Sequence, residues 1–242
     1  GSAPDETSAL YTGPVLLAAN TTVKSVAVRS NGQIGSVANQ SYTVLQQPVW
    51  SPAIASTWQW QLQGVIDTSY DVSAYNIDLF DTPQATIDQL KTDGRKVICY
   101  FNAGAWEDFR SDAGLFPEAV KGNTVNGFVN EKWLDISDIQ LLAPIMQARL
   151  DLAVSKGCDA VEPDNIDAFA YNNGFGLTAN DQLAYNLWLS NEANARGLSI
   201  GLTNDLAQIP VLEPFFDWAL NEQCFEFNNC NQLQPFIVAN KA

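Results

Sequence analysis

The sequence predicts a parallel α/β domain over residues 57–242, and more specifically a (β/α)8 barrel of the TIM type. Short apolar segments alternate with helical ones, which is the pattern of a parallel sheet with crossover helices. Several predicted strands end in Asn, Asp or Glu, and in such folds ligands bind at the carboxyl ends of the strands. An open doubly wound sheet is the competing fold.

Seven strands are expected from the apolar segments and their spacing. They are residues 57–63, 76–81, 96–102, 133–136, the short apolar stretch after Gly157, 198–204 and 216–222. An eighth strand would follow Lys241, so we expect the barrel to lack its last strand.

Three principal helices are expected between these strands, over residues 82–94, 144–157 and 178–196. Thr82 is expected to cap the first helix, and Pro144 to open the second, which stops at Gly157. Thr178 with Asp181 forms a capping-box pattern at the start of the third helix.

Residues 1–45 differ from the rest of the chain, and residues 46–56, with two prolines, are predicted to form a linker. Short β segments are expected at residues 15–17, 22–28 and 41–44, with Asn31-Gly32 as a hairpin turn. This part resembles the second half of a small β-sandwich module of the kind appended to carbohydrate-active enzymes.

The composition excludes several classes of protein. Of the 242 residues, 46% are apolar, which is enough for a substantial core, and no apolar run approaches the length of a membrane span. The net charge of -15, from 12 basic and 27 acidic residues, argues against nucleic-acid binding and permits a cationic partner.

Histidine is absent, so neither a Ser-His-Asp triad nor a zinc site with imidazole ligands can form. No glycine-rich nucleotide-binding motif is present either, and we expect no cofactor and no metal. Carboxylates remain as the main groups for proton chemistry.

The four cysteines fit no zinc-binding pattern. Cys224 and Cys230 close a short loop and are expected to form a disulfide in an oxidising compartment. Cys99 and Cys158 lie in or beside predicted strands, where buried free thiols and a second disulfide are both open.

Two carboxylates on different strands are the strongest candidates for catalysis. Side chains alternate along a strand, so Glu162 and Asp164 point the same way, with Cα atoms ~6.5 Å apart. By the same count Glu222 shares a face with Trp218 and Leu220. If Asp164 and Glu222 both line the mouth of the barrel, they form the pair that glycoside hydrolysis requires.

Each of the other acidic residues near these strand ends has a structural interpretation too. Glu162 is expected to be a buried support rather than a catalytic group. Asp167 is interpreted either as a helix N-cap or as part of the site, and Glu226 as a solvated loop charge.

Aromatic and polar residues near the strand ends favour a sugar ligand, because aromatic faces stack on pyranose rings and amides bind hydroxyl groups. Trp58, Trp106 and Trp133 have core packing as the alternative. The residues expected to bind substrate are Trp60, Gln61, Asp78, Asp81, Tyr100, Asn102, Glu107, Asn165, Asp167 and Asn204.

From about Trp58 onward the chain resembles glycoside hydrolase family 114, the endo-α-1,4-polygalactosaminidases. The matching segments are Trp58-Gln59-Trp60-Gln61-Leu62, Tyr75-Asn76-Ile77-Asp78-Leu79-Phe80-Asp81, Val97-Ile98-Cys99-Tyr100-Phe101-Asn102-Ala103-Gly104, Val161-Glu162-Pro163-Asp164-Asn165 and Asn221-Glu222-Gln223-Cys224. The resemblance implies a TIM barrel with Asp164 and Glu222 as the catalytic carboxylates.

The resulting hypothesis is a secreted, monomeric, endo-acting hydrolase of α-1,4-linked galactosamine-containing polysaccharide, a cationic galactosaminan or galactosaminogalactan of the kind found in biofilms. Asp164 is expected to be the nucleophile and Glu222 the acid/base of a retaining mechanism. The alternatives are a non-catalytic carbohydrate-binding barrel and a metal-dependent carbohydrate deacetylase.

Overall fold

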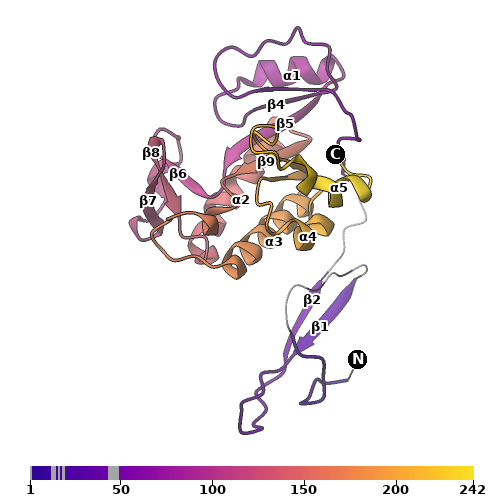
Figure 1. Ribbon diagram of the computed structural model, residues 1–242, viewed down its shortest axis with the longest axis vertical. Coiled ribbons are helices and arrows are strands. Elements are labelled where there is room, and N and C mark those ends of the chain that lie inside the picture. Colours follow the sequence, from indigo (N-terminus) through magenta and orange to yellow (C-terminus); the bar gives the residue numbers. More distant parts are fainter. Residues whose placement is uncertain (1, 12–14, 16, 18–19, 43–48) are drawn as a thin grey trace. The chain divides into compact units, whose positions relative to one another are not determined.

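A computed structural model describes residues 2–11, 15, 17, 20–42 and 49–242 of the chain (Figure 1). By its internal contacts the chain divides into two compact units, residues 1–47 and 48–242.

In the smaller unit the described residues form one antiparallel hairpin. Its strands are β1 (Thr21–Ser25) and β2 (Ala38–Tyr42). Between them and the turn, Val28 and Ile34 form one further antiparallel bridge. Gly32 has φ +78°, which suits the turn expected there.

The side chains of both strands are exposed, so the described part of this unit shows a hairpin and no second layer. Of the other segments expected to be strands, Val15 and Leu17 lie outside any strand. Leu16 and residues 43–44 lie outside the described residues, as do residues 46–48 of the expected linker.

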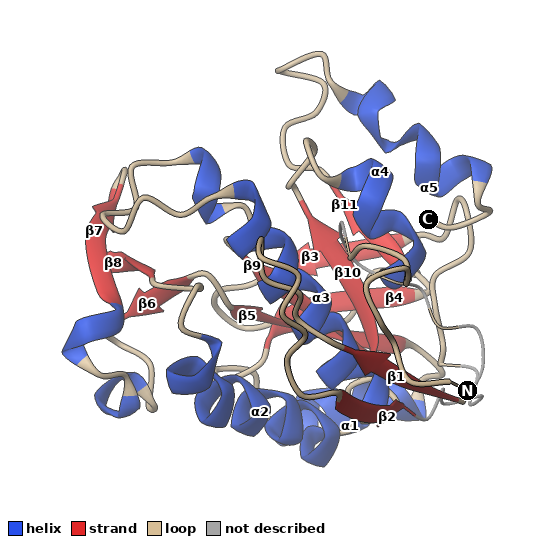
Figure 2. Ribbon diagram, turned by 90° about the horizontal axis from the view of Figure 1, so that it is seen from below, coloured by secondary structure: helices blue, strands red, loops and turns tan. Residues whose placement is uncertain are grey.

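The larger unit is built on a curled sheet of six parallel strands in the order β11-β10-β9-β5-β4-β3 (Figure 2). The strands are β3 (Trp58–Gln61), β4 (Ala74–Asp78), β5 (Lys96–Asn102), β9 (Ala160–Asp164), β10 (Ser199–Thr203) and β11 (Trp218–Leu220). All five neighbouring pairs run parallel, so the carboxyl ends of the strands meet at one edge.

The expected strand at residues 133–136 is wrong as a member of this sheet, which therefore has six strands rather than seven. Those residues end β8 (Phe128–Leu134), which pairs antiparallel with β6 (Ala105–Glu107) and β7 (Lys121–Val125). A turn at Gly127, with φ +89°, reverses the chain between β7 and β8. In both views this small sheet lies at the opposite end of the domain from α4 and α5 (Figures 1 and 2).

The strand expected at residues 76–81 begins two residues earlier and stops at Asp78. Asp78 stops it because its carboxylate accepts hydrogen bonds from the backbone N–H groups of Phe80 and Asp81, both at 2.8 Å. A side chain that bonds to the backbone two and three residues on closes a turn there.

The helices of the larger unit are α1 (Gln84–Thr92), α2 (Ile139–Lys156), α3 (Ala179–Ala195), α4 (Ile209–Leu212) and α5 (Gln234–Val238). Short 3-10 turns occupy residues 113–115, 118–120, 168–170, 213–215 and 230–233. Within the described ranges, no helix has both the length and the apolar character needed to cross a bilayer.

The capping box at Thr178 and Asp181 is confirmed. The expected start of α2 at Pro144 is wrong, because Asp138 accepts a hydrogen bond from the N–H of Leu141 and starts the helix earlier. Thr82 is not a cap either, since the residue before α1 is Pro83 and no side chain caps it.

The two faces of the curled sheet have different partners. Its outer face packs with α1, α2 and α3 in the main core, through strand residues such as Ile77, Phe101 and Leu202. Its inner face carries a smaller apolar cluster that includes Ala160 and Trp218. The apolar floor of the inner face supports the polar residues nearer the carboxyl ends of the strands.

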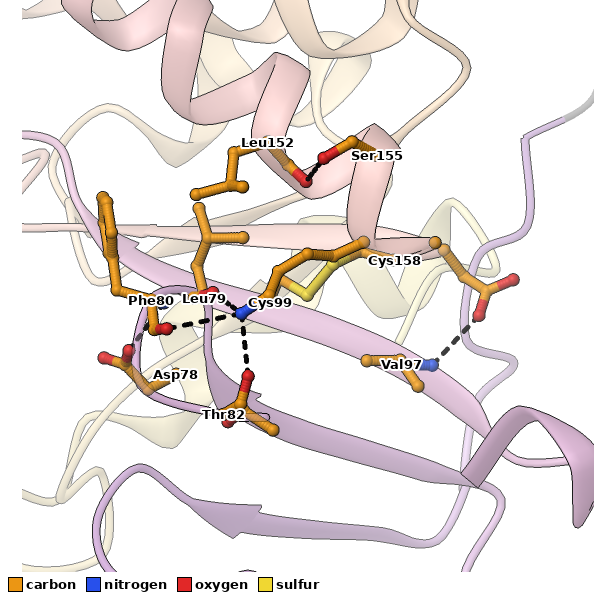
Figure 3. The surroundings of a disulfide bond; sticks show 12 residues. Asp78, Leu79, Phe80, Thr82, Val97, Cys99, Leu152, Ser155 and Cys158 are labelled. Carbon is orange, nitrogen blue, oxygen red and sulfur yellow. Dashed lines mark hydrogen bonds between the residues drawn. A yellow bond between two sulfur atoms is a disulfide. The ribbon is translucent and has the colours of Figure 1, made fainter. Parts of the chain in front are cut away.

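A disulfide between Cys99 and Cys158 ties β5 to the start of β9 (Figure 3). Beside it, the Lys156 ammonium donates to the carbonyls of Leu79 and Thr82, both at 2.7 Å. The bridge and the ammonium together fix the central strands against the turn after β4. Of the two states left open for these cysteines, the structure has the bridge.

We expect the two disulfides of the chain to differ in their contribution to stability. Cys99–Cys158 closes 59 positions and Cys224–Cys230 closes 6. Loop-closure entropy gives about 4 kcal/mol for the longer loop and about 2 kcal/mol for the shorter one. Urea denaturation of the two double-alanine variants measures the difference. Equal losses, or a larger loss from Cys224 and Cys230, would contradict the assignment of Cys99–Cys158 as the main covalent restraint.

Candidate active site

The pairing of β5 with β9 brings polar side chains together on the inner face of the sheet. In the register, Tyr100 lies opposite Glu162 and Asn102 lies opposite Asp164. Since side chains alternate along each strand, all four point to the same face. The base of the site is therefore formed by two side chains from each of the two central strands, near their carboxyl ends.

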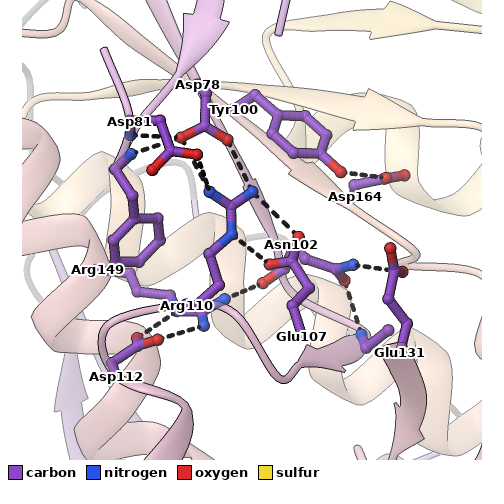
Figure 4. A network of polar contacts seen from close by, with 12 residues as sticks. Asp78, Asp81, Tyr100, Asn102, Glu107, Arg110, Asp112, Glu131, Arg149 and Asp164 are labelled. Carbon is purple, nitrogen blue, oxygen red and sulfur yellow. Dashed lines mark hydrogen bonds and ion pairs between the residues drawn. The ribbon is translucent and has the colours of Figure 1, made fainter. Parts of the chain in front are cut away.

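Asp164 is held by donors from two elements. The Tyr100 hydroxyl donates to Asp164 Oδ2 at 2.7 Å (Figure 4), and the Asn165 backbone N–H donates to Asp164 Oδ1 at 2.7 Å. The pKa of Asp164 is raised to about 6. Burial is the main cause, the Tyr100 hydrogen bond opposes it, and the charge of Glu222 adds to it. At neutral pH Asp164 is therefore a poised, mostly ionised carboxylate.

The backbone around Asp164 is fixed by a close approach of two loops. The N–H groups of Ala103 and Gly104 both donate to the Asp164 carbonyl, at 2.9 and 3.0 Å. A Cβ on Gly104 would lie 1.7 Å from the Asn165 carbonyl oxygen, so only glycine fits. Asn165 itself has φ +57°, a conformation that Asn tolerates better than most residues.

Glu222 follows β11 and is held by the end of β10. The Asn204 amide donates to Glu222 Oε2 at 3.0 Å, and the Glu222 backbone N–H donates to Asn204 Oδ1 at 3.0 Å. The charge of Glu222 raises the pKa of both Asp164 and Asp167, which places the three carboxylates within electrostatic reach. Carboxylates from two different strands thus converge at this edge.

A pocket of about 360 Å³ adjoins Glu222. Asp167, Tyr171 and Asp205 line it. Burial, together with the charge of Asp164, raises the pKa of Asp167 to about 6. The ring of Tyr171 stacks on Trp133, with ring centroids 4.9 Å apart. The pocket therefore combines negative charge with a half-exposed aromatic ring.

Arg110 forms ion pairs with the acidic residues at the ends of β4 and β6 (Figure 4). It forms ion pairs with Asp78 at 2.7 Å and Glu107 at 2.8 Å, and a longer one with Asp81 at 3.5 Å. The carboxylates of Asp78 and Glu107 are buried, whereas the Asp81 side chain is 78% exposed. Asp81 is the member of this cluster that faces solvent.

Three other residues expected to bind substrate have different surroundings. Trp60 is 39% exposed on the edge strand β3 and presents its ring to solvent. Gln61 bonds to its own loop, donating to the carbonyl of Val65 at 2.9 Å and accepting from the N–H of Asp67 at 2.9 Å. Asn102 is buried, and its Oδ1 accepts from the N–H of Ala105 at 2.7 Å.

Sequence reasoning did not single out Glu131, Tyr171 or Asp205. Burial and the charge of Glu107 raise the pKa of Glu131 to about 7, and Asn102 Nδ2 lies 3.5 Å from its carboxylate (Figure 4). Asp205 follows Asn204 directly and could have been found as an acid at a strand end. Glu131 had no such signal, because it belongs to the antiparallel sheet.

The loop after Glu222 is closed by the Cys224–Cys230 disulfide, whose Cα atoms are 4.7 Å apart. Phe227 of this loop lines the pocket, and Glu226 is exposed. In the described part of the chain no three His, Cys, Asp or Glu side chains are grouped as a metal site.

Comparisons with known proteins found relatives for both parts of the chain. Glycoside-hydrolase family GH114 matches residues 39–242, and the Fn3 associated family matches residues 1–42. The crystal structure of Ega3 from Aspergillus fumigatus in complex with galactosamine is 41% identical, with a TM-score of 0.78. That match covers 83% of this chain and 78% of Ega3.

The glycoside hydrolase domain of PelA from Pseudomonas aeruginosa is 14% identical, with a TM-score of 0.54 over 71% of this chain and 68% of that domain. Identity at this level supports a shared fold alone. None of the proteins with curated descriptions matches the sequence.

We expect Tyr100→Phe to raise the pKa of Asp164 above its value of about 6, because the hydroxyl stabilises the ionised form. A hydrogen bond to a charged group is worth enough to move the pKa by roughly one unit. Carbon-13 NMR titration of the carboxyl group measures the shift. Tyr185→Phe is the matched control, since that buried hydroxyl donates to the Ala103 carbonyl. An Asp164 pKa that is the same in Tyr100→Phe as in the wild type would refute the role of this hydrogen bond.

Proposed function

This chain belongs to glycoside hydrolase family GH114 and is a glycoside hydrolase, and we propose that it cleaves α-1,4 links within galactosamine-containing polysaccharide. The observation that carries the proposal is the convergence of Asp164 and Glu222 from two strands onto one edge of the sheet. Two facing carboxylates are the equipment of glycoside hydrolysis.

We assign Asp164 as the nucleophile. Its carboxylate is mostly ionised at neutral pH, since its pKa is about 6. Tyr100 and the Asn165 N–H hold both oxygens in place, which reduces the reorganisation needed when one oxygen attacks the anomeric carbon. Attack forms a glycosyl ester and breaks the bond to the leaving sugar.

We assign Glu222 as the acid/base. It would donate its proton to the glycosidic oxygen as the bond breaks, and then take a proton from the water that hydrolyses the ester. Asn204 fixes the carboxylate throughout the cycle.

The charge around the site supports a cationic amino-sugar polymer as substrate. Asp167 lines the pocket beside Glu222, and Asp81 faces solvent. Ega3, which is 41% identical, was crystallised with galactosamine. Free ammonium groups would be attracted to these carboxylates, so partly deacetylated polymer is the preferred substrate in this proposal. Trp60 and Tyr171 offer aromatic faces for the sugar rings.

The finer points of the architecture and location belong to the same proposal. The six parallel strands would be part of a TIM-type barrel, and residues 1–45 an accessory module followed by a linker at residues 46–56. Two disulfides suit an oxidising compartment, and a polysaccharide substrate suits a secreted enzyme acting as a monomer.

We expect Asp164→Asn and Glu222→Gln each to lose at least ~100-fold in reducing-end release from deacetylated α-1,4-galactosaminan, because each removes a group that takes part in bond breaking. Glu226→Gln is the matched control, since it removes the same charge from an exposed position four residues after Glu222. It should retain wild-type activity.

Polymer binding measured alongside separates the possible failures. A wild-type protein that binds the polymer and does not cut it would be a carbohydrate-binding barrel. Hydrolysis that survives in both Asp164→Asn and Glu222→Gln would refute the assignment of this pair. Faster cleavage of the fully acetylated polymer would contradict the electrostatic choice of substrate.

A further inference from the structure

A buried polar pair lies beneath Asp164 on the inner face of the sheet. Glu162, on β9, and Asn76, on β4, are both 0% exposed. The Asn76 amide donates a hydrogen bond to Glu162 Oε2. Asp164 lies two residues beyond Glu162 on the same face, so the pair directly underlies the proposed nucleophile.

Each member of this pair also has one side-chain oxygen without a hydrogen-bond partner among the described residues. These atoms are Asn76 Oδ1 and Glu162 Oε1. If Glu162 were ionised, both of these atoms would be acceptors, and neither could satisfy the other. A buried acceptor left without a donor costs free energy. A proton on Glu162 Oε1 turns one of the two into a donor.

We propose that Glu162 is held as a neutral carboxylic acid, whose O–H donates to Asn76 Oδ1 and closes a ring of two hydrogen bonds with the amide. In this arrangement Glu162 is a positioning residue: it supports Asp164 without placing a second negative charge beside it. One proton thereby satisfies two buried oxygens.

The charges that face Glu162 agree with this state. Asp164 follows it on β9, Tyr100 lies opposite on β5, and the charge of Glu222 reaches it from the end of β11. On that side the Asn76 amide donates to Glu162, and the indole of Trp60, on β3, lies near the carboxyl group without a hydrogen bond to its Oε1. None of these groups is a cation. Burial, with the charge of Asp164, raises the pKa of Glu162 to about 8.

The proton has a consequence for the proposed mechanism, on which this part of the inference rests. Two carboxylates on one face, two residues apart, disfavour each other's ionisation. Because Glu162 holds its proton, Asp164 can ionise with a pKa of about 6 and serve as an anion at neutral pH.

Glu162→Gln tests the inference, because glutamine copies the neutral acid and its amide can donate to Asn76 Oδ1. We expect kcat/KM at pH 7 within about threefold of wild type and an unmoved acid limb of the pH–rate profile. If Glu162 were ionised in the wild type, removing its charge would lower the pKa of Asp164. The acid limb would then move down by about one pH unit or more, and the proposal would be overturned.

A stability measurement tests the proton without any reference to catalysis. In the native state Glu162 keeps its proton up to a pKa of about 8, whereas the ordinary value is 4.5. Raising the pH between these values therefore favours unfolding of the wild type, and this contribution is absent from Glu162→Gln. We expect the melting temperature of Glu162→Gln relative to wild type to rise steadily from pH 5 to pH 8 and to level off above.

A constant difference in melting temperature across this range would overturn the proposal, whatever the activity.

Asp205→Asn is the matched control, because burial and the charge of Asp167 raise the pKa of Asp205 to about 8 as well. Combining Glu162→Gln with Asp205→Asn should give the sum of the two pH-dependent differences. If Asp205→Asn alone removed the whole fall in the melting temperature of the wild type between pH 5 and pH 8, Glu162 would not hold the proton. An inactive wild type with the expected melting behaviour would refute the proposed function and leave the protonated pair standing.

Discussion

Carboxylates gathered at one edge of a sheet repel one another, and the site of this protein depends on how that repulsion is relieved. On one side Arg110 takes up Asp78 and Glu107 in a buried cluster. On the other side, the described partners of Asp164 are the Tyr100 hydroxyl and a backbone N–H, and neither is a cation. The first half is held in ion pairs, while the second keeps its charge available for chemistry.

The second half requires a precise backbone, because hydroxyl and amide donors act only at hydrogen-bond distance. Asn165 and Asn204 turn the chain just after β9 and β10 with positive φ, and Gly104 lets a neighbouring loop approach within contact of Asn165. The Cys99–Cys158 bridge fixes the strands beneath. The bridge that stabilises the strands therefore also helps to hold the backbone that orients the carboxylates.

Much of this could be predicted from the sequence, because strands have a period of two. That period placed Glu162 and Asp164 on one face, and the Asn and Asp residues at strand ends indicated which edge carries the site. The sequence could not show that Arg110 reaches Asp78, 32 residues away, and so Asp78 looked like a substrate contact. Residues 133–136 have the composition of a parallel strand, and only their pairing with β6 reveals an antiparallel one.

The central claim is that Asp164 and Glu222 act on the same sugar. A crystal structure of Glu222→Gln with a deacetylated α-1,4-galactosamine oligomer tests it most directly. Our account predicts an anomeric carbon within about 3.5 Å of an Asp164 oxygen, with the glycosidic oxygen in contact with residue 222. An oligomer bound with its glycosidic bonds away from both residues would contradict it.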